Sequence, residues 1–388
     1  MDVIEDLLTR GVANIIPRKT DLVEVLKSGR KLNVYLGIDP TSTHIHLGNA
    51  VPLRKLQIFA DLGHHVTFLI GDFTTLIGDT SDKDSERPVL TSEQIETNFQ
   101  TYKQQASKLV DFSKITVRHN SEWLSKLGYA EIIKIARHFS LNDFISRELI
   151  KKRLEAGRSV SLPETLYPVI QGYDSYFMDT DIQLGGTDQT FNMQAGRTLQ
   201  KVLRHKESFV LANVFLEGTD GRKMSKSWGN AIWLDDSPND MYGKIMTVRD
   251  NLIEQYFNLA TNVSQNIINE ISSRLNSGEN PMHLKKELAF TITSELHGPE
   301  AASSAQSNFE STIQSGQLPD DLPSLSPASY NIIDVLTESR LAGSKSIARR
   351  LIDQGGVKVN GTSVSQYELS VPAGSVVSVG PLHHVRIN

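Results

Sequence analysis

The sequence predicts an α/β protein, in which a parallel β-sheet covered by helices is followed by an α-helical domain and a small C-terminal α+β unit. Three observations predict this organisation. Strand-like and helix-like stretches alternate in the first half of the chain, strand-like stretches disappear after Asp235, and a proline-rich stretch at 317–327 sets off the end of the chain. Strands that alternate with helices at short pitch are typical of parallel sheets with helices on both faces.

The strands of the first half are short apolar runs bounded by turn residues. Asn33–Ile38 ends at Asp39-Pro40-Thr41, which favours a loop, and Val66–Ile70 and Ile115–Val117 predict two further strands. Between the first two of these runs, apolar residues recur at helical spacing as far as Gly63, a glycine suited to a helix C-terminus. The pattern therefore predicts strand, helix, strand along this part of the chain.

The second half is predicted to be helical and then to change character. Helical patterns extend from about Asp235 to Asn308, and three prolines lie within 317–327, a composition typical of a linker. We therefore expect four segments, listed here in chain order: a sheet domain at 1–234, a helical domain at 235–316, a linker at 317–329 and a last unit at 330–388.

Composition limits the classes of protein to consider. A chain of 388 residues exceeds one core of ordinary size, and 39% hydrophobic with 22% charged residues is typical of a globular protein. No apolar run approaches the roughly 20 residues of a membrane helix, and the acidic N-terminus resembles neither a signal nor a transit peptide. We expect a cytoplasmic protein without membrane contact. The absence of cysteine excludes disulfides and thiolate metal sites, and we expect no metal site made by the protein itself.

The first candidate site is His46-Leu-Gly48-Asn49, which follows the strand at Asn33–Ile38. Pro52 is best tolerated near a helix start, so these residues are expected at a helix N-terminus above the end of a strand. Free backbone N–H groups and the helix dipole favour an anion there. On these residues alone, a histidine exposed at the end of a loop remains the alternative.

The second candidate is the lysine-serine segment, Lys223–Ser227. Two ammonium groups and two hydroxyls follow a turn-rich approach at Gly218–Gly221, and such groups suit the charge of a triphosphate. A solvated surface loop is the alternative. The net charge of −5 argues against a protein that coats nucleic acid nonspecifically but leaves local basic patches open.

Two further segments carry polar groups in patterns that suit a ligand. Tyr167, Gln171 and Asp174 have helical spacing and share one face, which is either the wall of a polar pocket or solvated surface. Gly186 permits close approach of a ligand to the backbone, and Asp188 could accept hydrogen bonds from ribose. A simple turn with Asp188 as a helix N-cap is the other interpretation, and the two are compatible.

Together these segments resemble the class I aminoacyl-tRNA synthetases. His46–Asn49 resembles their HIGH signature, with Asn49 in place of the second histidine, and Lys223–Ser227 matches KMSKS in full about 180 residues later. Within the class the chain is most similar to bacterial-type tyrosyl-tRNA synthetases. That similarity runs along nearly the whole chain, through the segments around Tyr35, Asp79, Tyr167 and Gln183.

The resemblance implies a Rossmann-like catalytic domain and a two-step reaction. L-tyrosine would be activated by ATP, with Mg²⁺, to tyrosyl-adenylate and pyrophosphate, and tyrosine would then be transferred to the 3′ end of tRNA(Tyr). The family is homodimeric, so the resemblance also implies a homodimer. A tryptophanyl-tRNA synthetase and a synthetase-derived RNA-binding or splicing protein without catalysis are the alternatives. The Tyr35/Asp174 pair and the C-terminal unit argue against the first, and the intact Lys223–Ser227 argues against the second.

The resemblance also implies roles for individual residues. Tyr35 and Asp174 would bind the phenolic hydroxyl of tyrosine, and Gln183 would lie beside the substrate. The ammonium group of tyrosine would be bound by Asp79, Tyr167 and Gln171. The implied ATP-binding residues are Asp39, Thr41, His46, Gly48, Asn49, Gly186, Asp188, Gln189, Lys223, Met224, Ser225 and Lys226. The implied catalytic residues are His46, Asn49, Lys223 and Lys226, together with Lys83 and Arg87 on a polar loop.

The last unit, 330–388, resembles the small αL RNA-binding module that bacterial-type tyrosyl enzymes carry at the C-terminus. Ile332, Ile333, Val335 and Leu336 predict the apolar face of one helix, a second helix follows Ser344, and Gly355–Gly361 predicts a turn with a short strand pair. The basic residues implied to bind tRNA are Lys345, Arg349, Arg350 and Lys358. The charge of the module is modest, so it should assist tRNA binding without dominating it.

Overall fold

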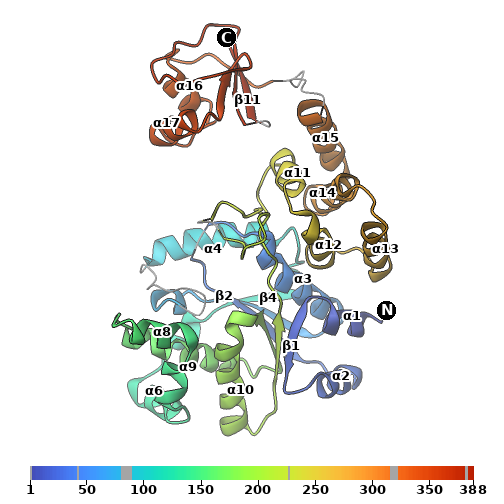
Figure 1. Ribbon diagram of the computed structural model, residues 1–388. Helices are drawn as coiled ribbons and strands as arrows, with labels where there is room; N and C mark the ends of the chain where they lie inside the picture. Colours follow the sequence, from blue (N-terminus) through green and yellow to red (C-terminus); the bar gives the residue numbers. More distant parts are fainter. Residues whose placement is uncertain (1, 42, 80–89, 226–227, 315–321, 381–382) are drawn as a thin grey trace. The chain divides into compact units, whose positions relative to one another are not determined.

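The computed structural model describes residues 2–41, 43–79, 90–225, 228–314, 322–380 and 383–388. The chain forms two compact units (Figure 1). Unit 1 comprises residues 1–235 and 248–279, and unit 2 comprises residues 236–247 and 280–388. In the described part of the chain, no helix is long and apolar enough to cross a membrane.

Unit 1 is built on a six-stranded sheet with the strand order β1-β6-β5-β2-β3-β4. All neighbouring strands are parallel except β1, which pairs antiparallel with β6. The strands are β1 (Val12–Ile16), β2 (Asn33–Ile38), β3 (His65–Ile70), β4 (Ile115–His119), β5 (Ile182–Gly186) and β6 (Phe209–Asn213). From β2 the chain adds β3 and then β4 on one side of the sheet, and it later adds β5 and then β6 on the other side of β2. This is the topological switch point at which α/β sheets bind ligands beyond the carboxyl ends of their strands.

Burial on both faces explains why these runs form strands. β6 is buried at every position and β5 at all but its last residue, as expected for a parallel sheet covered on both sides. The strands predicted at Asn33–Ile38, Val66–Ile70 and Ile115–Val117 are confirmed, the last two extended by one and two residues. Because β2 and β3 pair in register up to Ile38 and Ile70, the residues after them reach the same edge of the sheet.

Helices cover the sheet and extend beyond it. The predicted helix ending near Gly63 is α3 (Leu47–Asp61), and Gly63 follows it with φ of +77°. Pro52 lies inside this helix, further from its start than the sequence suggested. The other helices of unit 1 are α1 (Val3–Thr9), α2 (Lys19–Lys27), α4 (Ser92–Ala106), α5 (Ser121–Leu124), α6 (Tyr129–Ala136), α7 (Leu141–Ile145), α8 (Glu148–Glu155), α9 (Leu162–Phe177), α10 (Thr190–Arg204), α12 (Ile253–Ala260) and α13 (Gln265–Asn276), with short 3₁₀ turns at Thr74–Leu76, Thr187–Gln189 and Asp250–Leu252.

Two buried cations of α3 tie other helices to it. Lys55 Nζ donates to the carbonyl of Leu7 in the last turn of α1 at 2.6 Å, and Arg54 Nη2 donates to the carbonyl of Ala260 at the end of α12 at 2.8 Å. Cations interact favourably with the free carbonyls of a helix C-terminus. Burial lowers the pKa of Lys55 to about 7, so near neutral pH its amine exists in charged and neutral forms, and either form can donate this hydrogen bond.

Unit 2 begins with helices: α11 (Pro238–Met246), α14 (Pro281–His297) and α15 (Pro299–Phe309), followed by a π-helical turn at Glu310–Gln314. α11 packs against both α14 and α15, with the Tyr242 and Phe309 ring centroids 5.6 Å apart. Over the described residues from 236 to 314, every regular element is helical, which agrees with the loss of strand patterns after Asp235.

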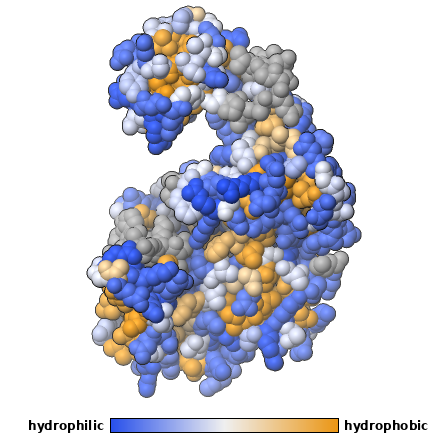
Figure 2. Space-filling model, viewed as in Figure 1, coloured by the Kyte–Doolittle hydropathy of each residue, from blue (hydrophilic) through white to orange (hydrophobic). Residues whose placement is uncertain are grey.

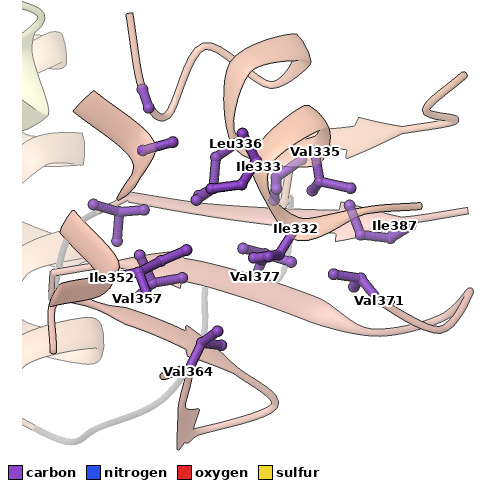
Figure 3. Packing of buried hydrophobic residues seen from close by; sticks show 14 residues of the cluster. Ile332, Ile333, Val335, Leu336, Ile352, Val357, Val364, Val371, Val377 and Ile387 are labelled. Carbon is purple, nitrogen blue, oxygen red and sulfur yellow. The ribbon is translucent and has the colours of Figure 1, made fainter. Parts of the chain in front are cut away.

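The end of the chain forms a small α+β body with its own core. Its helices are α16 (Ile332–Glu338) and α17 (Lys345–Asp353), and its sheet has the order β7-β11-β10-β8-β9. The strands are β7 (Ser324–Leu325), β8 (Val357–Val359), β9 (Thr362–Ser363), β10 (Val376–Val379) and β11 (His383–Ile387). Ile332 and Leu336 of α16 belong to one cluster of buried side chains with Val377 of β10 (Figure 3).

The predicted linker extends into this body. Ser324 and Leu325 pair with β11 as the edge strand β7, although Pro323 and Pro327 flank them. Proline is compatible with an edge strand because one side of such a strand needs no ladder hydrogen bonds.

Candidate active site

A cavity of about 890 Å³ opens at the carboxyl ends of the sheet strands in unit 1. Strand ends, the start of α3, α9 and the lysine-serine segment all contribute to its wall. The residues implied by the sequence that line it are Tyr35, Asp39, Thr41, His46, Gly48, Asn49, Asp79, Tyr167, Gln171, Asp174, Gly186, Asp188, Gln189, Lys223, Met224 and Ser225. Lys83, Arg87 and Lys226 lie outside the described residues. Of the described candidates in unit 1, Gln183 alone is not part of the wall.

Gln183 instead supports Tyr35 from behind. Gln183 is fully buried, its Nε2 donates to the carbonyl of Met193 at 2.9 Å, and its Oε1 accepts from the Tyr35 hydroxyl at 3.2 Å. Burial and the nearby Asp174 raise the pKa of the Tyr35 phenol, so Tyr35 presents a neutral hydroxyl. The structure therefore makes Gln183 a support for a cavity-lining phenol.

Asp174 is a buried carboxylate held by two neutral donors. Trp123 Nε1 donates to Oδ1 at 2.8 Å, and Asn120 Nδ2 donates to Oδ2 at 3.1 Å. Burial raises the pKa of Asp174 to about 8, with Asp39 and Asp72 adding to the rise and the two hydrogen bonds opposing it. The group is consequently poised between its protonated and ionised forms near neutral pH, as is common where a carboxyl group serves a function.

Tyr167, Gln171 and Asp174, which share one face of α9, line the cavity. Tyr167 and Asp174 are 6% and 2% exposed, and Gln171 lies between them on the cavity wall. By contrast, Phe177, on the face that the sequence suggested was apolar, is 41% exposed. Of the two interpretations left open by the spacing, the polar pocket wall is confirmed.

Hydrogen bonds link the residues implied for the ammonium group to those implied for ATP. The Tyr167 hydroxyl donates to Asp39 Oδ2 at 2.9 Å, and Gln189 Nε2 donates to Asp79 Oδ2 at 2.7 Å. Thr74 donates to the other oxygen of Asp39 at 2.7 Å. The two carboxylates are thus fixed in place by neutral donors, in a wall that can bind a cationic ammonium group or ribose hydroxyls.

The start of α3 has the geometry that the sequence suggested. His46 is the residue before the helix, and its backbone N–H donates to Asn49 Oδ1 at 3.3 Å. A Cβ on Gly48 would approach the His46 ring to 3.0 Å, so glycine leaves room for that ring. Burial, together with the charge of Lys223, lowers the pKa of His46 to about 4. At neutral pH the imidazole is therefore uncharged, and it can donate a hydrogen bond to a phosphate but cannot neutralise its charge.

Backbone hydrogen bonds join the two signature segments. Leu47 N donates to the carbonyl of Ile232 at 2.9 Å, and Leu234 N donates to the carbonyl of Ile45 at 2.8 Å. Between them, the Trp233 ring lies 5.8 Å from the His46 ring. The chain that leaves the lysine-serine segment is therefore attached directly to the entrance of α3.

Lys223 reaches across the cavity toward the end of β5. Its Nζ lies 3.7 Å from Asp188 Oδ2 and 4.6 Å from the centroid of the Phe215 ring. Asp188 lies in the 3₁₀ turn Thr187–Gln189, and Gln189 is the residue that precedes α10. The interpretation of Asp188 as an N-cap is therefore wrong, and Asp188 instead lines the cavity.

Among the residues of this site that sequence reasoning missed are Thr74, Asn120, Trp123 and Phe215. Asn120 follows β4 directly, and the logic that identified Asp39 after β2 would have found it. Phe215 lines the cavity two residues after β6. Trp123 had no local signal, because its role depends only on which carboxylate its indole N–H meets.

The four basic residues implied to bind tRNA all lie on the surface of the C-terminal body. Lys345, Arg349 and Arg350 are on α17, and Lys358 is on β8, all exposed. Lys345 also pairs with Asp334 at 2.7 Å. Exposed cations on one helix and a neighbouring strand are suited to phosphate contacts.

Comparison with known proteins agrees with this geometry. A family model described as tRNA synthetases class I (W and Y) matches residues 27–314, and an S4 domain model matches residues 332–377. Tyrosine–tRNA ligase from Dehalococcoides mccartyi strain CBDB1 is 40% identical over 97% of this chain and 96% of its own. Tyrosine–tRNA ligase 2 from Pseudoalteromonas translucida is 42% identical over 95% of this chain and 94% of its own.

Among solved structures, a C-terminally truncated mitochondrial tyrosyl-tRNA synthetase from Aspergillus nidulans has a similar fold. The TM-score is 0.66 at 22% identity, over 79% of this chain and 93% of that one. At this identity the likeness concerns the fold alone.

Proposed function

Because the chain belongs to the tyrosyl-tRNA synthetase family of class I, we propose that its cavity binds L-tyrosine and ATP together and joins them as tyrosyl-adenylate. The activity is that of a tyrosine–tRNA ligase. The observation that best supports the proposed site is the Asp174 carboxylate, buried beside Tyr35 and held by Asn120 and Trp123.

The phenol of the substrate would be read by Tyr35 and Asp174. A hydrogen bond to a charged group contributes roughly 1.5–3 kcal/mol, and leaving a buried partner unsatisfied costs a similar amount. Phenylalanine lacks the hydroxyl, so Tyr35 and Asp174 would make no hydrogen bond to it. Asp79, Tyr167 and Gln171 would bind the ammonium group, for which a carboxylate and two neutral oxygens are suitable partners.

The nucleotide would lie along the start of α3 and the end of β5. Asp39, Thr41, Gly48, Asn49, Gly186, Asp188 and Gln189 would contact adenosine, and Met224 and Ser225 would add backbone and hydroxyl contacts. The tyrosine carboxylate attacks the α-phosphorus, the bond to the β-phosphate oxygen breaks, and pyrophosphate leaves. Little covalent assistance is needed for such a transfer, so rate comes from positioning and electrostatics.

Charge on the phosphates would be met by Lys223 and Lys226 and by the loop residues Lys83 and Arg87, with neutral His46 as a hydrogen-bond donor. Mg²⁺ would be carried in by the phosphates and would neutralise part of their charge. Such a site suits Mg²⁺, which is usually held by substrate phosphates, water and one or two carboxylates. Among the described residues, no cluster of three or more His, Asp or Glu side chains could hold a metal by itself.

The second step would transfer tyrosine to tRNA(Tyr). The S4 domain would bind the tRNA through Lys345, Arg349, Arg350 and Lys358. Because phosphate contacts release counterions, each of these residues should contribute to the salt dependence of tRNA binding. We place this reaction in the cytoplasm, where the tRNA is available.

A homodimer is supported by apolar side chains on the surface of unit 1. Tyr129 and Ile133 of α6 and Leu141 of α7 are 79%, 53% and 64% exposed, and Figure 2 shows hydrophobic colour gathered over α6. Apolar surface of this kind is typical of interfaces. We expect Ile133→Glu to shift the chain from dimer to monomer in sedimentation, whereas a sedimentation coefficient equal to that of the unaltered chain would contradict this interface.

ATP–pyrophosphate exchange tests the proposed function. Exchange should be supported by tyrosine and not by tryptophan or phenylalanine. Asp174→Ala should abolish tyrosine-dependent exchange, and Tyr35→Phe should lower its kcat/KM by roughly 10- to 100-fold. Tight RNA binding by the unaltered chain without exchange for any of the three amino acids would reject an active enzyme.

A further inference from the structure

One residue of the motif region has no role in the proposed reaction although it is almost fully buried. Asn230 lies three residues after Ser227, the end of the lysine-serine segment, and it is 3% exposed. It does not line the cavity, so it is not placed to touch a substrate. Its side chain nevertheless makes three hydrogen bonds, all of them to residues between Asp220 and Ser225.

Two of these bonds hold the backbone on either side of Met224, and the third reaches Asp220. Asn230 Nδ2 donates to the carbonyl of Lys223 at 3.2 Å and to Asp220 Oδ1 at 2.7 Å, and Asn230 Oδ1 accepts from Ser225 N at 2.9 Å. The backbone carbonyl of Asn230 also accepts from Thr219 N at 3.2 Å. One amide therefore holds the backbone immediately before and after Met224.

The surrounding chain is shaped to admit this amide. A Cβ on Gly218 would lie 2.3 Å from Asn230 Nδ2, so only glycine leaves room for it. Hydrogen bonds from Asn230 and from Arg222 hold the pKa of Asp220 below its ordinary range, which keeps that carboxylate an acceptor. Gly218 N donates to the carbonyl of Arg222 at 2.7 Å and closes the loop on the other side.

The contacts made by Asn230 continue to the catalytic lysine. With its carbonyl held, Lys223 directs its ammonium group to within 3.7 Å of Asp188 and over the Phe215 ring. We propose that Asn230 is a positioning residue, which fixes the backbone of Lys223 and Ser225 so that the lysine ammonium and the serine hydroxyl meet the phosphates of ATP. The proposal rests on the proposed function, because it assigns Asn230 to the same adenylate-forming step.

The test compares Asn230→Ala with Asn33→Ala as a matched control. Asn33 is also a hydrogen-bonded asparagine of unit 1, with Nδ2 donating to the carbonyl of Asp179 at 2.9 Å, but it lies at the start of β2, away from the cavity. A misplacement of about 1 Å at a reacting group can cost on the order of 100-fold in rate. We expect Asn230→Ala to lower kcat for tyrosine-dependent pyrophosphate exchange by about 10- to 100-fold.

Two further readouts separate positioning from a structural role. The Kd for tyrosine should stay within about twofold of that of the unaltered chain, and Asn230→Ala should keep a single cooperative thermal transition. In a Lys223→Ala background, Asn230→Ala should lower kcat by a smaller factor than in the unaltered chain, because the part of its effect that acts through the lysine is already lost. Asn230→Asp, which keeps the shape and the acceptor for Ser225 but loses the donor to Lys223, should also be slow.

The outcomes distinguish this inference from the proposed function. If the unaltered chain shows no exchange, the proposed function fails. If the unaltered chain is active and Asn230→Ala matches Asn33→Ala in kcat, the positioning role is overturned. It is also overturned if both Asn230 variants unfold, if tyrosine affinity falls in parallel with rate, or if the effects of Asn230→Ala and Lys223→Ala multiply.

Discussion

Replacing Asp174 with asparagine should make the protein more stable at pH 7 while it inactivates the enzyme. The pKa of this buried carboxyl is about 8, compared with an ordinary value of 3.8. Folding at pH 7 must therefore either add a proton or bury a charge. At about 1.4 kcal/mol for each pH unit between 3.8 and 7, this costs the folded state about 4 kcal/mol.

An asparagine removes that cost but loses one hydrogen bond. Trp123 and Asn120 donate to different oxygens of Asp174, and the NH₂ group of asparagine replaces one of these two acceptors. The donor that then has no partner costs roughly 1–3 kcal/mol. The expected net gain in the free energy of unfolding is about 1–3 kcal/mol at pH 7. Because the folded pKa is raised, the penalty from Asp174 fades as pH falls toward 3.8. The variant should therefore have no advantage at pH 4.5.

Urea unfolding at pH 4.5 and 7, followed by tryptophan fluorescence, measures this difference. All three tryptophans lie within residues 1–235, so the signal reports unit 1. Asp61→Asn serves as a control, since Asp61 is an exposed carboxylate paired with Lys114, and it should show no comparable gain. The reasoning is refuted if the curves of Asp174→Asn and the unaltered chain are separated equally at both pH values.

Three further predictions concern other residues. The pKa of Lys55 is lowered to about 7 in the folded protein, so the free energy of unfolding should rise by up to about 1.4 kcal/mol per pH unit between pH 7 and 9. Lys55→Met should flatten this rise. Equal pH slopes of the unfolding free energy for the variant and the unaltered chain, measured by urea unfolding, would contradict the lowered pKa. Asn49→His should change the rate of adenylate formation only modestly and, through loss of the acceptor for His46 N, cost about 1 kcal/mol in thermal stability; complete inactivity in single-turnover assays would show another role for the amide. A Cβ at Gly71 would lie 1.9 Å from Asp39 Oδ1, so Gly71→Ala should displace this carboxylate and raise the KM for ATP in pyrophosphate exchange. An unchanged KM would mean that ATP binding does not depend on the position of the Asp39 carboxylate.

Local signals were sufficient for the elements and for the order of the site segments. The run Asn33–Ile38 is apolar because a central parallel strand is buried on both faces, and Gly63 follows α3 because the chain needs a left-handed residue there. The signature segments could be recognised because phosphate chemistry limits which residues can serve. These patterns depend on neighbours along the chain, so the fold class and the helical middle followed from the sequence alone. The resemblance that the signature segments carry implied most of the candidate residues of the cavity.

The electrostatic state and the support of that cavity were decided only by tertiary packing. Asp174 meets Trp123 and Asn120 because α5 and the end of β4 pack beside α9, and His46 is uncharged because it is buried near Lys223. Tertiary packing also decides that Tyr167, Gln171 and Asp174 on α9 face the cavity and not solvent. Desolvation and hydrogen-bond partners depend on elements far apart in sequence, whereas periodicity and turn preference do not. For this reason the residues that act could be named from the sequence, but the groups that hold them could not.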